Sequence, residues 1–430
     1  MKPYYLLTLL FFLSLAVQAQ IVNIPDPIFK DALVNNPVVD TNDDGVGDTD
    51  VDTNNDGEVQ LSEALAVTAL YVNDFGINDM QGSEAFDNVV ILDCSDNNLQ
   101  IVDVTEMSNL EVLDFSSNFF AFVDVTQNPG LRELIGRSND MTQLNLTQNV
   151  NLELLDVGGN EFASLNVTQN PNLVYLDCAV NELTNLDVSQ NPNLESLEVS
   201  VNPLTSLDVS ANPALDFLEA NNCNLTTIDV TQNPALNTLF MGFNDLTGTI
   251  DFSQNIDLET VVLFENLLTH LDFSLNPNLE VAFLRDNELT SLNIKNGNSG
   301  IITFISTLNN PDLQCILVDD EDYANSQMCI DPIGEGWCKD ATTTYSEDCI
   351  LGVDDNALVA FSLSPNPAKQ QIRIQSSEAI DEIEVYTTAG ALVIEESNRR
   401  EVDVSSLPSG IYLARIFTTT EVVSKQFIKE

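Results

Sequence analysis

The sequence predicts a repeat solenoid of short parallel strands, and three observations indicate this fold. An asparagine or its substitute cysteine recurs every 21 residues, with one 22-residue step between Asn244 and Asn266. Around each one the apolar residues keep the spacing L-x-x-L-x-(C/V/F/L)-x-x-N-x-L-x-x-L-x-V. The phase holds from residue 89 to residue 310, through ten repeats and a degenerate eleventh near Ile305 and Asn310. The recurring positions are Asn97, Asn118, Asn139, Asn160, Asn181, Asn202, Cys223, Asn244, Asn266 and Asn287.

This spacing is the leucine-rich-repeat pattern, in which a short strand leads into a buried asparagine or cysteine. One repeat cannot bury its own leucines, so neighbouring turns must stack and share a continuous core. The chain turns inward at the asparagine, whose amide is expected to satisfy buried backbone groups of adjacent turns. We therefore expect a solenoid over residues 89–310, with caps at both ends.

The first 19 residues are typical of a secretory signal peptide. Lys2 precedes the apolar run from Leu6 to Val17, and small residues stand before Gln20. The run is short for a membrane span. The full sequence is strongly acidic, with a net charge of -53 and only 14 basic residues. This charge argues against nucleic-acid binding.

Residues 20–88 are expected to cap the solenoid. Asp26 and Pro27 start a helix whose apolar side chains recur on one face. Further on, a twelve-residue segment fits a calcium-binding loop at every position, with oxygen side chains, a glycine at the sharp turn and a final glutamate. Its predicted ligands are Asp52, Asn54, Asp56, Glu58, Gln60 and Glu63, and residues 64–72 are expected to form the exiting helix.

A solvated turn or a decayed loop is the alternative for this segment. A weaker candidate loop precedes it, with Asp40, Asn42 and Asp44 as ligands, but its final position falls on Asp52, which the next loop already uses. Calcium is expected to be structural, since no second helix pair is visible that it would open and close.

One outward column of the strands is acidic in the early repeats and apolar in the later ones. Residues that alternate with the buried leucines face outward. This column reads Asp93, Asp114, Ile135, Asp156, Asp177, Glu198, Glu219, Phe240, Val262 and Phe283. Neighbouring columns add Phe217, Phe243, Phe264 and Arg285, so we predict a partner-binding face here. Packing between turns, or cover by the C-terminal cap, is the competing interpretation.

A second acidic column is interpreted as turn chemistry. Its members are Asp103, Asp124, Asp187, Asp208, Asp229, Asp251 and Asp272. Each is followed two residues later by serine or threonine, the pattern of side chains that bond local backbone.

The seven cysteines divide by location. Cys94, Cys178 and Cys223 lie in the repeats, too far apart to pair, and are interpreted as small buried hydrophobes. Cys315, Cys329, Cys338 and Cys349 lie together in residues 311–350 of an exported chain, where two disulfides would close the end of the solenoid. Zinc is the alternative, although a CxxC knuckle is missing.

After a linker at residues 351–357, residues 358–430 change to short alternating strands and predict a small all-β sandwich. Four segments stand out in this part: Ser364-Pro365-Asn366-Pro367, Ile383-x-Val385-Tyr386, Val402-Asp403-Val404-Ser405 with Gly410-Ile411-Tyr412, and Lys425-Gln426-Phe427-Ile428. Together they resemble the type A C-terminal sorting domain of the bacterial type IX secretion system. The resemblance implies recognition by the type IX machinery, export across the outer membrane, removal of this domain, and release or surface attachment.

The body also resembles secreted leucine-rich-repeat proteins that carry this domain. In that group an IPDxxFKxAL opening, the calcium-like loop and a cap like that around Cys315 recur together. Related caps keep Cys315 and Cys349, so the resemblance implies the pairs Cys315–Cys349 and Cys329–Cys338.

The sequence contains little that points to catalysis. It has one histidine, His270, at an outer repeat position, and no motif that pairs it with a serine. We therefore expect a non-enzymatic, secreted or cell-surface protein that binds or adheres to a protein or glycan ligand. A structural surface-layer component and an accessory binding module of polysaccharide degradation are the alternatives.

Overall fold

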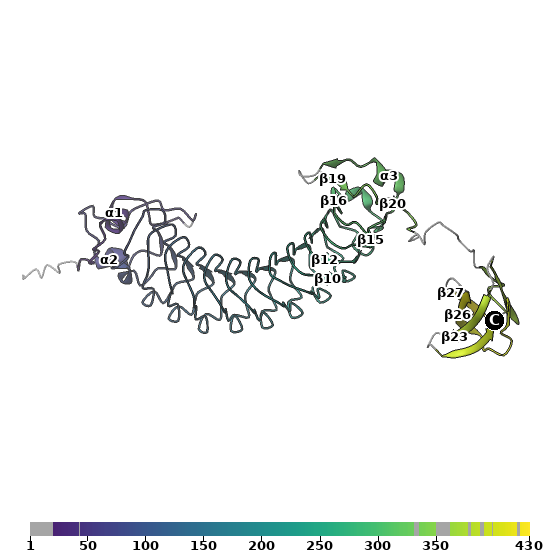
Figure 1. The fold of residues 1–430 in the computed structure, drawn as a ribbon. Coiled ribbons are helices and arrows are strands. Elements are labelled where there is room, and N and C mark those ends of the chain that lie inside the picture. Colours follow the sequence, from purple (N-terminus) through teal and green to yellow (C-terminus); the bar gives the residue numbers. More distant parts are fainter. Residues whose placement is uncertain are drawn as a thin grey trace, which may run out of the picture. The chain divides into compact units, whose positions relative to one another are not determined.

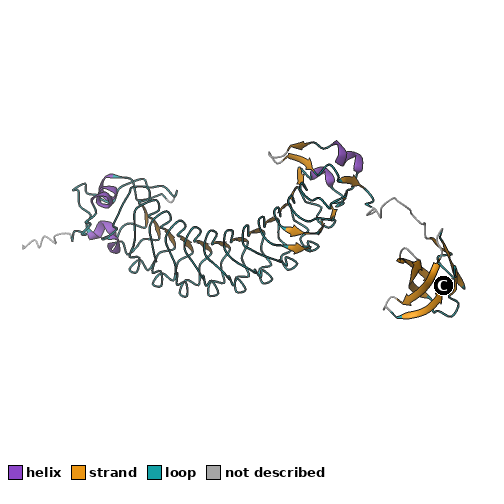
Figure 2. Cartoon of the chain, in the orientation of Figure 1, coloured by secondary structure: helices purple, strands orange, loops and turns teal. Residues whose placement is uncertain are grey.

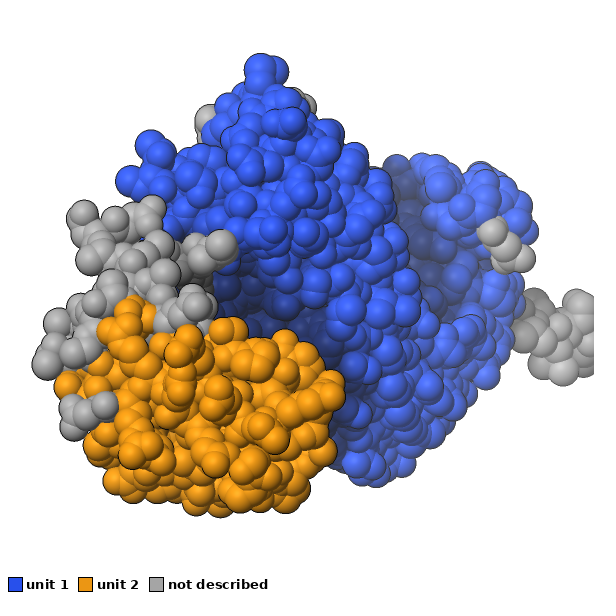
Figure 3. Space-filling model, turned by 90° about the vertical axis from the view of Figure 1, so that its right-hand side faces the viewer, with its two compact units in different colours: residues 1–349 blue, residues 350–430 orange. Residues whose placement is uncertain are grey.

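The computed structural model describes residues 20–42, 44–330, 335–349, 362–376, 380–387, 391–397, 399–418 and 422–430. The chain forms two compact units, residues 1–349 and residues 350–430, which Figure 3 colours separately. The predicted signal peptide and the predicted linker lie outside the described residues.

The first unit is the predicted solenoid, built on one sheet of 14 strands. The unit curves as an arc, and the strands line its inner side while the loops lie on the outer side (Figures 1 and 2). Neighbours pair in parallel, with leucine beside leucine as at Leu176 and Leu197, except for the last, antiparallel strand. In sheet order the strands are β1 (Ala69–Tyr71), β2 (Ile91–Asp93), β3 (Val112–Asp114), β4 (Glu133–Ile135), β5 (Leu154–Asp156), β6 (Tyr175–Asp177), β7 (Ser196–Glu198), β8 (Phe217–Glu219), β9 (Thr238–Phe240), β11 (Thr260–Val262), β14 (Val281–Phe283), β16 (Phe304–Ser306), β19 (Glu335–Cys338) and β18 (Cys329–Ile330).

The recurring asparagines tie each turn to the turn before it. The amide nitrogen of Asn181 donates to the carbonyl oxygens of Val157 (3.1 Å) and Cys178 (3.0 Å), and its side-chain oxygen accepts from the Phe162 amide (3.0 Å). Buried backbone groups are thereby paired at each turn. At the exceptional position, the Cys223 sulfur lies 3.2 Å from the Val199 carbonyl oxygen, so cysteine fills the same place.

A second buried asparagine ladder runs through the outer turns, and the sequence interpretation missed it. The amide nitrogen of Asn191 donates to the carbonyl oxygens of Val167 (3.0 Å) and Asn170 (2.8 Å). Its side-chain oxygen is buried and has no hydrogen-bond partner among the described residues, and the same holds along the ladder. Its members are Asn128, Asn149, Asn170, Asn191, Asn212, Asn233, Asn255 and Asn276. The 21-residue recurrence of asparagine, mostly before proline, is the signal that would have revealed it.

The N-terminal cap forms part of the solenoid. Helix α1 (Pro27–Asn35) begins as predicted, with the Asp26 carboxylate accepting the Ile28 and Phe29 amides. The predicted exiting helix over residues 64–72 is wrong. The chain makes one turn of helix, α2 (Leu61–Ala64), and then strand β1, whose amides and carbonyls pair with β2. Pairing with an open sheet edge satisfies these backbone groups, which overrides any helical tendency of the segment. A short 3-10 helix, η1 (Ser83–Ala85), leads into the repeats.

The C-terminal third of the solenoid carries additional parallel strands opposite the main sheet. One pair consists of β10 (Thr247–Gly248) and β12 (Leu267–Leu268). A four-stranded sheet has the order β13 (His270–Asp272), β15 (Ser291–Asn293), β17 (Cys315–Leu317) and β20 (Thr344–Ser346). The 3-10 helix η2 (Ser299–Ile301) and helix α3 (Glu321–Ser326) complete this end.

The second unit is the predicted β-sandwich. A three-stranded sheet contains β21 (Ser362–Ser364), β22 (Gln371–Gln375) and β25 (Glu401–Asp403). A four-stranded antiparallel sheet contains β24 (Leu392–Ser397), β23 (Ile380–Thr387), β26 (Gly410–Thr418) and β27 (Val422–Lys429). Side chains of both sheets, such as Ile372, Val385 and Phe427, form a core separate from that of the solenoid. Within the described residues of the chain, no helix combines the length and apolar character that crossing a membrane requires.

Candidate functional site

The early part of the inner face is a row of crowded carboxylates. The register of strands β5, β6, β7 and β8 brings Asp156, Asp177, Glu198 and Glu219 side by side. Asp114 on β3 belongs to the same column and is separated from Asp156 by Ile135 on β4. Burial raises the pKa of Asp114, Asp177 and Glu198 above the ordinary range. The repeat spacing therefore stacks acidic side chains at positions that are partly shielded from water. This desolvation disfavours their ionised forms.

Asp156 is the most buried carboxylate of the row, with 8% of its surface exposed. Burial, reinforced by repulsion from Asp177, raises its pKa to about 6. The Gly158 amide donates to it at 3.2 Å, and the Arg137 guanidinium nitrogen lies 3.9 Å from its other oxygen. These two favourable contacts do not offset the cost of burying the charge.

A polar network links the carboxylate row to the later turns. The Tyr175 hydroxyl donates to Glu198 at 2.9 Å, and Glu219 accepts from Ser200 and Asn221. The side-chain oxygen of Asn221 in turn accepts the Gly242 amide at 2.7 Å. Side chains on neighbouring turns therefore hold one another in place across the acidic part of the face.

The later part of the inner face is an aromatic cluster, which we define as Phe217, Phe240, Phe243, Phe264 and Phe283. The rings meet edge to face, with centroids 5.6 Å apart for Phe217 and Phe240, 4.8 Å for Phe243 and Phe264, and 5.1 Å for Phe264 and Phe283. Phe243 is 54% exposed, whereas the other four are half-buried against their neighbours. The cluster ends on the buried ring of Phe304, 5.4 Å from Phe283.

Gly242 makes room for the middle of the aromatic cluster. A β-carbon at this position would lie 2.8 Å from the Phe264 ring, closer than such contacts occur. The sequence interpretation did not single out this glycine. Arg285, which was predicted to join the binding face, has its guanidinium nitrogen 2.5 Å from the Asp286 carboxylate beside it.

The candidate calcium loop is held together by its own hydrogen bonds. Asp52 accepts the Asp56 and Gly57 amides, and Gln60 donates to the Asp56 carboxylate at 3.1 Å. Glu63 accepts from Thr53, Asn54 and the Gln60 amide. The Glu58 carboxylate pairs with Lys30 at 2.6 Å.

The donor set of this loop suits calcium, because carboxylate and amide oxygens are the ligands that the ion prefers. The Gln60 side chain lies within hydrogen-bond distance of both Asn54 and Asp56. Glu63 would have to exchange its hydrogen bonds for the ion. Across the described residues, the structure contains no group of three His, Cys, Asp or Glu side chains arranged to hold a metal. The calcium site stays a prediction.

The weaker loop has a similar internal arrangement. The Asp40 carboxylate accepts the Asn42 and Gly45 amides, and the Asp44 carboxylate accepts the Val46 amide. These contacts are ordinary turn chemistry.

The four cap cysteines form the two disulfides that the resemblance implied, Cys315–Cys349 and Cys329–Cys338. Zinc is thereby excluded for these residues. Cys94, Cys178 and Cys223 are free and buried, as predicted. His270 is exposed, and its ring contacts the hydroxyl groups of Thr269 and Thr290. Its described hydrogen bonds include no carboxylate that would orient the ring.

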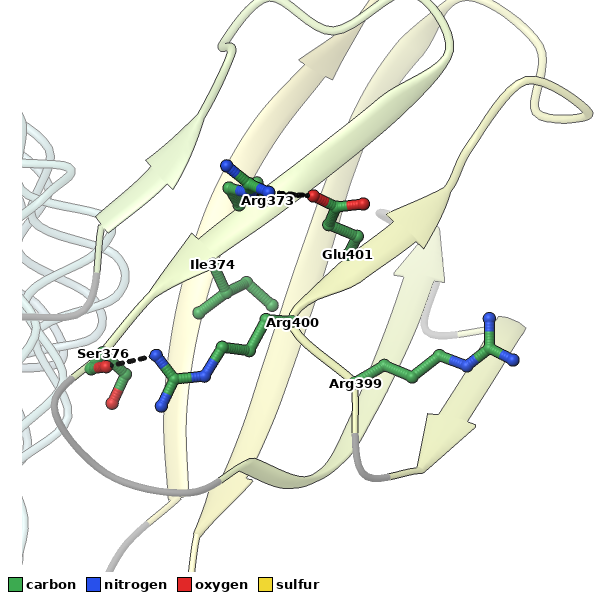
Figure 4. A pocket seen from close by; sticks show the side chains of 6 residues that line it. All are labelled: Arg373, Ile374, Ser376, Arg399, Arg400 and Glu401. Atoms are coloured by element: carbon green, nitrogen blue, oxygen red, sulfur yellow. Dashed lines mark hydrogen bonds and ion pairs between the residues drawn. The ribbon is translucent and has the colours of Figure 1, made fainter.

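The second unit contains a hollow of about 560 Å³ lined by three arginines (Figure 4). Arg373 pairs with Glu401, and Arg400 donates to the Ser376 carbonyl oxygen at 2.7 Å. Figure 4 shows the side chains of Arg399 and Arg400 pointing in different directions. The arginines therefore do not converge on one anion-binding position.

Comparison with known proteins agrees with this architecture. Residues 362–430 match the secretion system C-terminal sorting domain. Internalin InlF of Listeria monocytogenes is 18% identical over 72% of this chain and 89% of its own, with a TM-score of 0.56. A leucine-rich-repeat protein of Leptospira interrogans is 25% identical over 55% of this chain, with a TM-score of 0.48, and the match spans 62% of that protein. No curated protein sequence matches the chain.

These findings define a leucine-rich-repeat solenoid followed by a sorting domain. Residues 362–430 belong to the secretion system C-terminal sorting domain family, which confirms the resemblance of this segment to the type IX domain. The chain is therefore a leucine-rich-repeat protein directed to secretion or to the cell surface.

Proposed function

We propose that the chain is a non-enzymatic binding protein whose partner docks on the inner face of the later turns, over the aromatic cluster. The observation that carries this proposal is the environment of Phe243. This residue is 54% exposed, yet its ring centroid lies 4.8 Å from that of Phe264. Gly242 leaves the space that the Phe264 ring occupies. An organised aromatic surface open to solvent is the composition typical of an interface centre.

The competing interpretation, cover by the C-terminal cap, accounts for only one end of the row. Phe304 is buried and pairs through β16 with the cap strand β19, and Phe283 packs on it. Phe243 lies three turns earlier in the sheet, in the turn that follows β9. Its exposure supports a docking role for the middle of the cluster.

The arrangement of the rings favours a protein partner over a glycan. Sugar rings stack on a free aromatic face, whereas these rings meet neighbours at interplanar angles of 86°, 78° and 70°. Their faces are thus partly taken by the edges of adjacent rings. Apolar side chains of a protein can fill the remaining irregular surface.

The test compares two phenylalanines of equal exposure. Phe243 and Phe119 are each 54% exposed, but Phe119 lies outside the aromatic cluster. Binding of the purified protein to panels of immobilised proteins and glycans is measured for F243A, F119A and G242A. F243A and G242A are expected to weaken capture of whichever ligand is bound by about tenfold or more, and F119A is expected to leave it unchanged.

Melting temperatures of the same variants separate binding from folding. Equal capture by F243A, G242A and the native chain would remove the proposed site. Retained capture with lost stability would instead support the aromatic cluster as packing. A surface-layer role would show as self-association of the chain without ligand capture.

We also propose that a calcium ion stabilises the loop of residues 52–63. Oxygen donors at the first, third and fifth positions, Gly57 with φ of 81° at the sharp turn and Glu63 at the end support this proposal. When bound, the ion would supply positive charge among carboxylates of which Glu58 alone has a cationic partner among the described contacts, Lys30. The role is structural, because the loop lies in the cap that closes the solenoid.

A further inference from the structure

Every repeat turn of the solenoid passes through the left-handed backbone region at the residue just before the recurring asparagine or cysteine. The φ angles of these residues lie between 51° and 65°. The reason is hydrogen bonding to the next turn. The Val180 amide, for example, donates to the Ser200 carbonyl oxygen at 2.8 Å while the chain turns inward toward Asn181. The residues are Asp96, Ser117, Ser138, Gly159, Val180, Val201, Asn222, Phe243, Glu265, Asp286 and Asn309.

Val180, Val201 and Phe243 do not suit this conformation. Glycine, asparagine and aspartate adopt it readily, whereas a β-branched or bulky residue there is an outlier. Burial does not compensate, since these side chains are 53%, 44% and 54% exposed. Neither backbone preference nor the core explains them. Strained, exposed residues of this kind point to a function.

The three side chains form one apolar edge beside the carboxylate row. Val180 follows Asp177 by three residues, and Val201 follows Glu198 by three. Phe243 stands at the same position two turns after Val201, with Asn222 between them. At a strand spacing of about 4.8 Å, the edge is about 14 Å long. It therefore begins beside the acidic row and ends in the aromatic cluster.

The charge around the edge is predominantly negative, with Arg137 beside Asp156 as the cation at its N-terminal end. Between Arg137 and Arg285 the sequence contains no lysine or arginine, while aspartate and glutamate occur in every turn. A ligand on the inner face of these turns therefore meets carboxylates whose charge no lysine or arginine of residues 138–284 neutralises. Electrostatic complementarity thus selects a cationic partner and disfavours anionic ones.

We propose that the edge formed by Val180, Val201 and Phe243 binds an extended segment of a basic protein. Apolar side chains of that segment contact the edge, and its lysine or arginine side chains reach the carboxylates of Asp177, Glu198 and Glu219. The proposal rests on the proposed function and names the class of partner that the same face takes.

The probe is a library of immobilised peptides of about 15 residues that alternate lysine or arginine with apolar residues. A matched library replaces each basic residue with glutamate, and a third carries glutamine. The full protein is expected to bind members of the basic library, with affinity that falls as salt rises. Equal binding to the glutamate library, or no binding to any basic peptide, would overturn the proposal.

The variant V180N/V201N tests the edge without risking the fold. Asparagine occupies the same position at Asn222 and tolerates the left-handed conformation, so this variant is expected to melt at a higher temperature than the native chain. It is nevertheless expected to bind basic peptides about tenfold more weakly. The control V150N makes the same exchange at a valine that is 47% exposed on an outer turn, and should not change binding.

The outcomes separate this inference from the proposed function. If F243A weakens binding and V180N/V201N does not, the aromatic cluster remains the docking site and the edge is refuted. If neutral peptides or glycans bind and basic peptides do not, the docking site of the proposed function is retained and the inference of a basic partner is refuted. Unchanged binding in both variants removes both proposals.

Discussion

The buried carboxylate of Asp156 should lower stability at neutral pH, and Asp156→Asn should restore it. Burial raises the pKa of Asp156 from an ordinary value of 3.8 to about 6. One pKa unit corresponds to about 1.4 kcal/mol, so the ionised side chain costs about 3 kcal/mol above pH 6. Asparagine keeps an oxygen for the Gly158 amide, which donates at 3.2 Å. It loses the attraction of Arg137, a contact of 3.9 Å to an exposed side chain worth less than about 1 kcal/mol.

The sign of the pH dependence follows from the raised pKa. The stability associated with protonated Asp156 is fully present below pH 3.8 and is lost as pH rises through about 6. About half of the cost is already present at pH 5, because the unfolded chain ionises there and the folded chain does not. Asp156→Asn should therefore raise the free energy of unfolding by about 2 kcal/mol at pH 7.5 and about 1 kcal/mol at pH 5.

Urea unfolding at the two pH values measures this difference, with circular dichroism reporting on the solenoid and fluorescence of the buried Trp337 on its C-terminal end. Asp187→Asn is the matched control, since it removes the same charge from an exposed turn. Hydrogen bonds from Ser189 lower the pKa of Asp187, so its contribution does not change between pH 5 and 7.5. Equal effects of both variants, or destabilisation by Asp156→Asn at pH 7.5, would refute the argument.

Three further outcomes are expected. Chelation of calcium should lower the melting temperature of the protein, and D52A/D56A should remove that response, because an ion that binds only the native loop must stabilise it; an identical melting curve with and without calcium would exclude the site. Asn181→Ala should lower the free energy of unfolding by about 3 kcal/mol, and Asn191→Ala should lower it by about 1 to 2 kcal/mol. Only the former leaves a buried backbone amide, that of Phe162, unpaired. The reverse order in urea unfolding would contradict the hydrogen-bond assignment. Deletion of residues 350–430 should leave the melting of the solenoid unchanged, because the two units have separate cores, and should abolish surface display in fractionated cells; display of the truncated chain would count against sorting by this domain.

The period of the recurring asparagines was sufficient to predict the solenoid, because one repeated contact fixes the structure of every turn. The same argument failed at residues 64–72, where the sequence has apolar residues but no repeat. There the outcome depended on an open sheet edge, since β1 pairs with β2 and Leu70 bridges Val39. Pairing of this kind is set by distant residues, which a local pattern does not contain.

The position of the candidate site was predictable from the sequence, but the burial of its individual side chains was not. The outward columns of acidic and aromatic residues were visible in the sequence, and the structure places them on the inner face. How far each side chain is buried depends on its neighbours in adjacent turns. Asp156 is 8% exposed, although it occupies the same column as the half-buried Asp114. Gly242 was not noticed, because its effect acts on Phe264, 22 residues later.

In such a solenoid, a ligand-binding site is best sought where a residue type does not suit the backbone conformation that its turn imposes. The leucines, both asparagine ladders and the left-handed residue are each required by contacts between turns, so their repetition carries no information about a ligand. Gly159 and Asn222 satisfy the left-handed position at little cost, and the intervening Val180 and Val201 do not. The two valines gain no burial in return, and they lie within a stretch that contains no lysine or arginine. A partner that contacts them recovers the apolar surface that the fold leaves exposed, which is the physical reason to place its docking site at this edge.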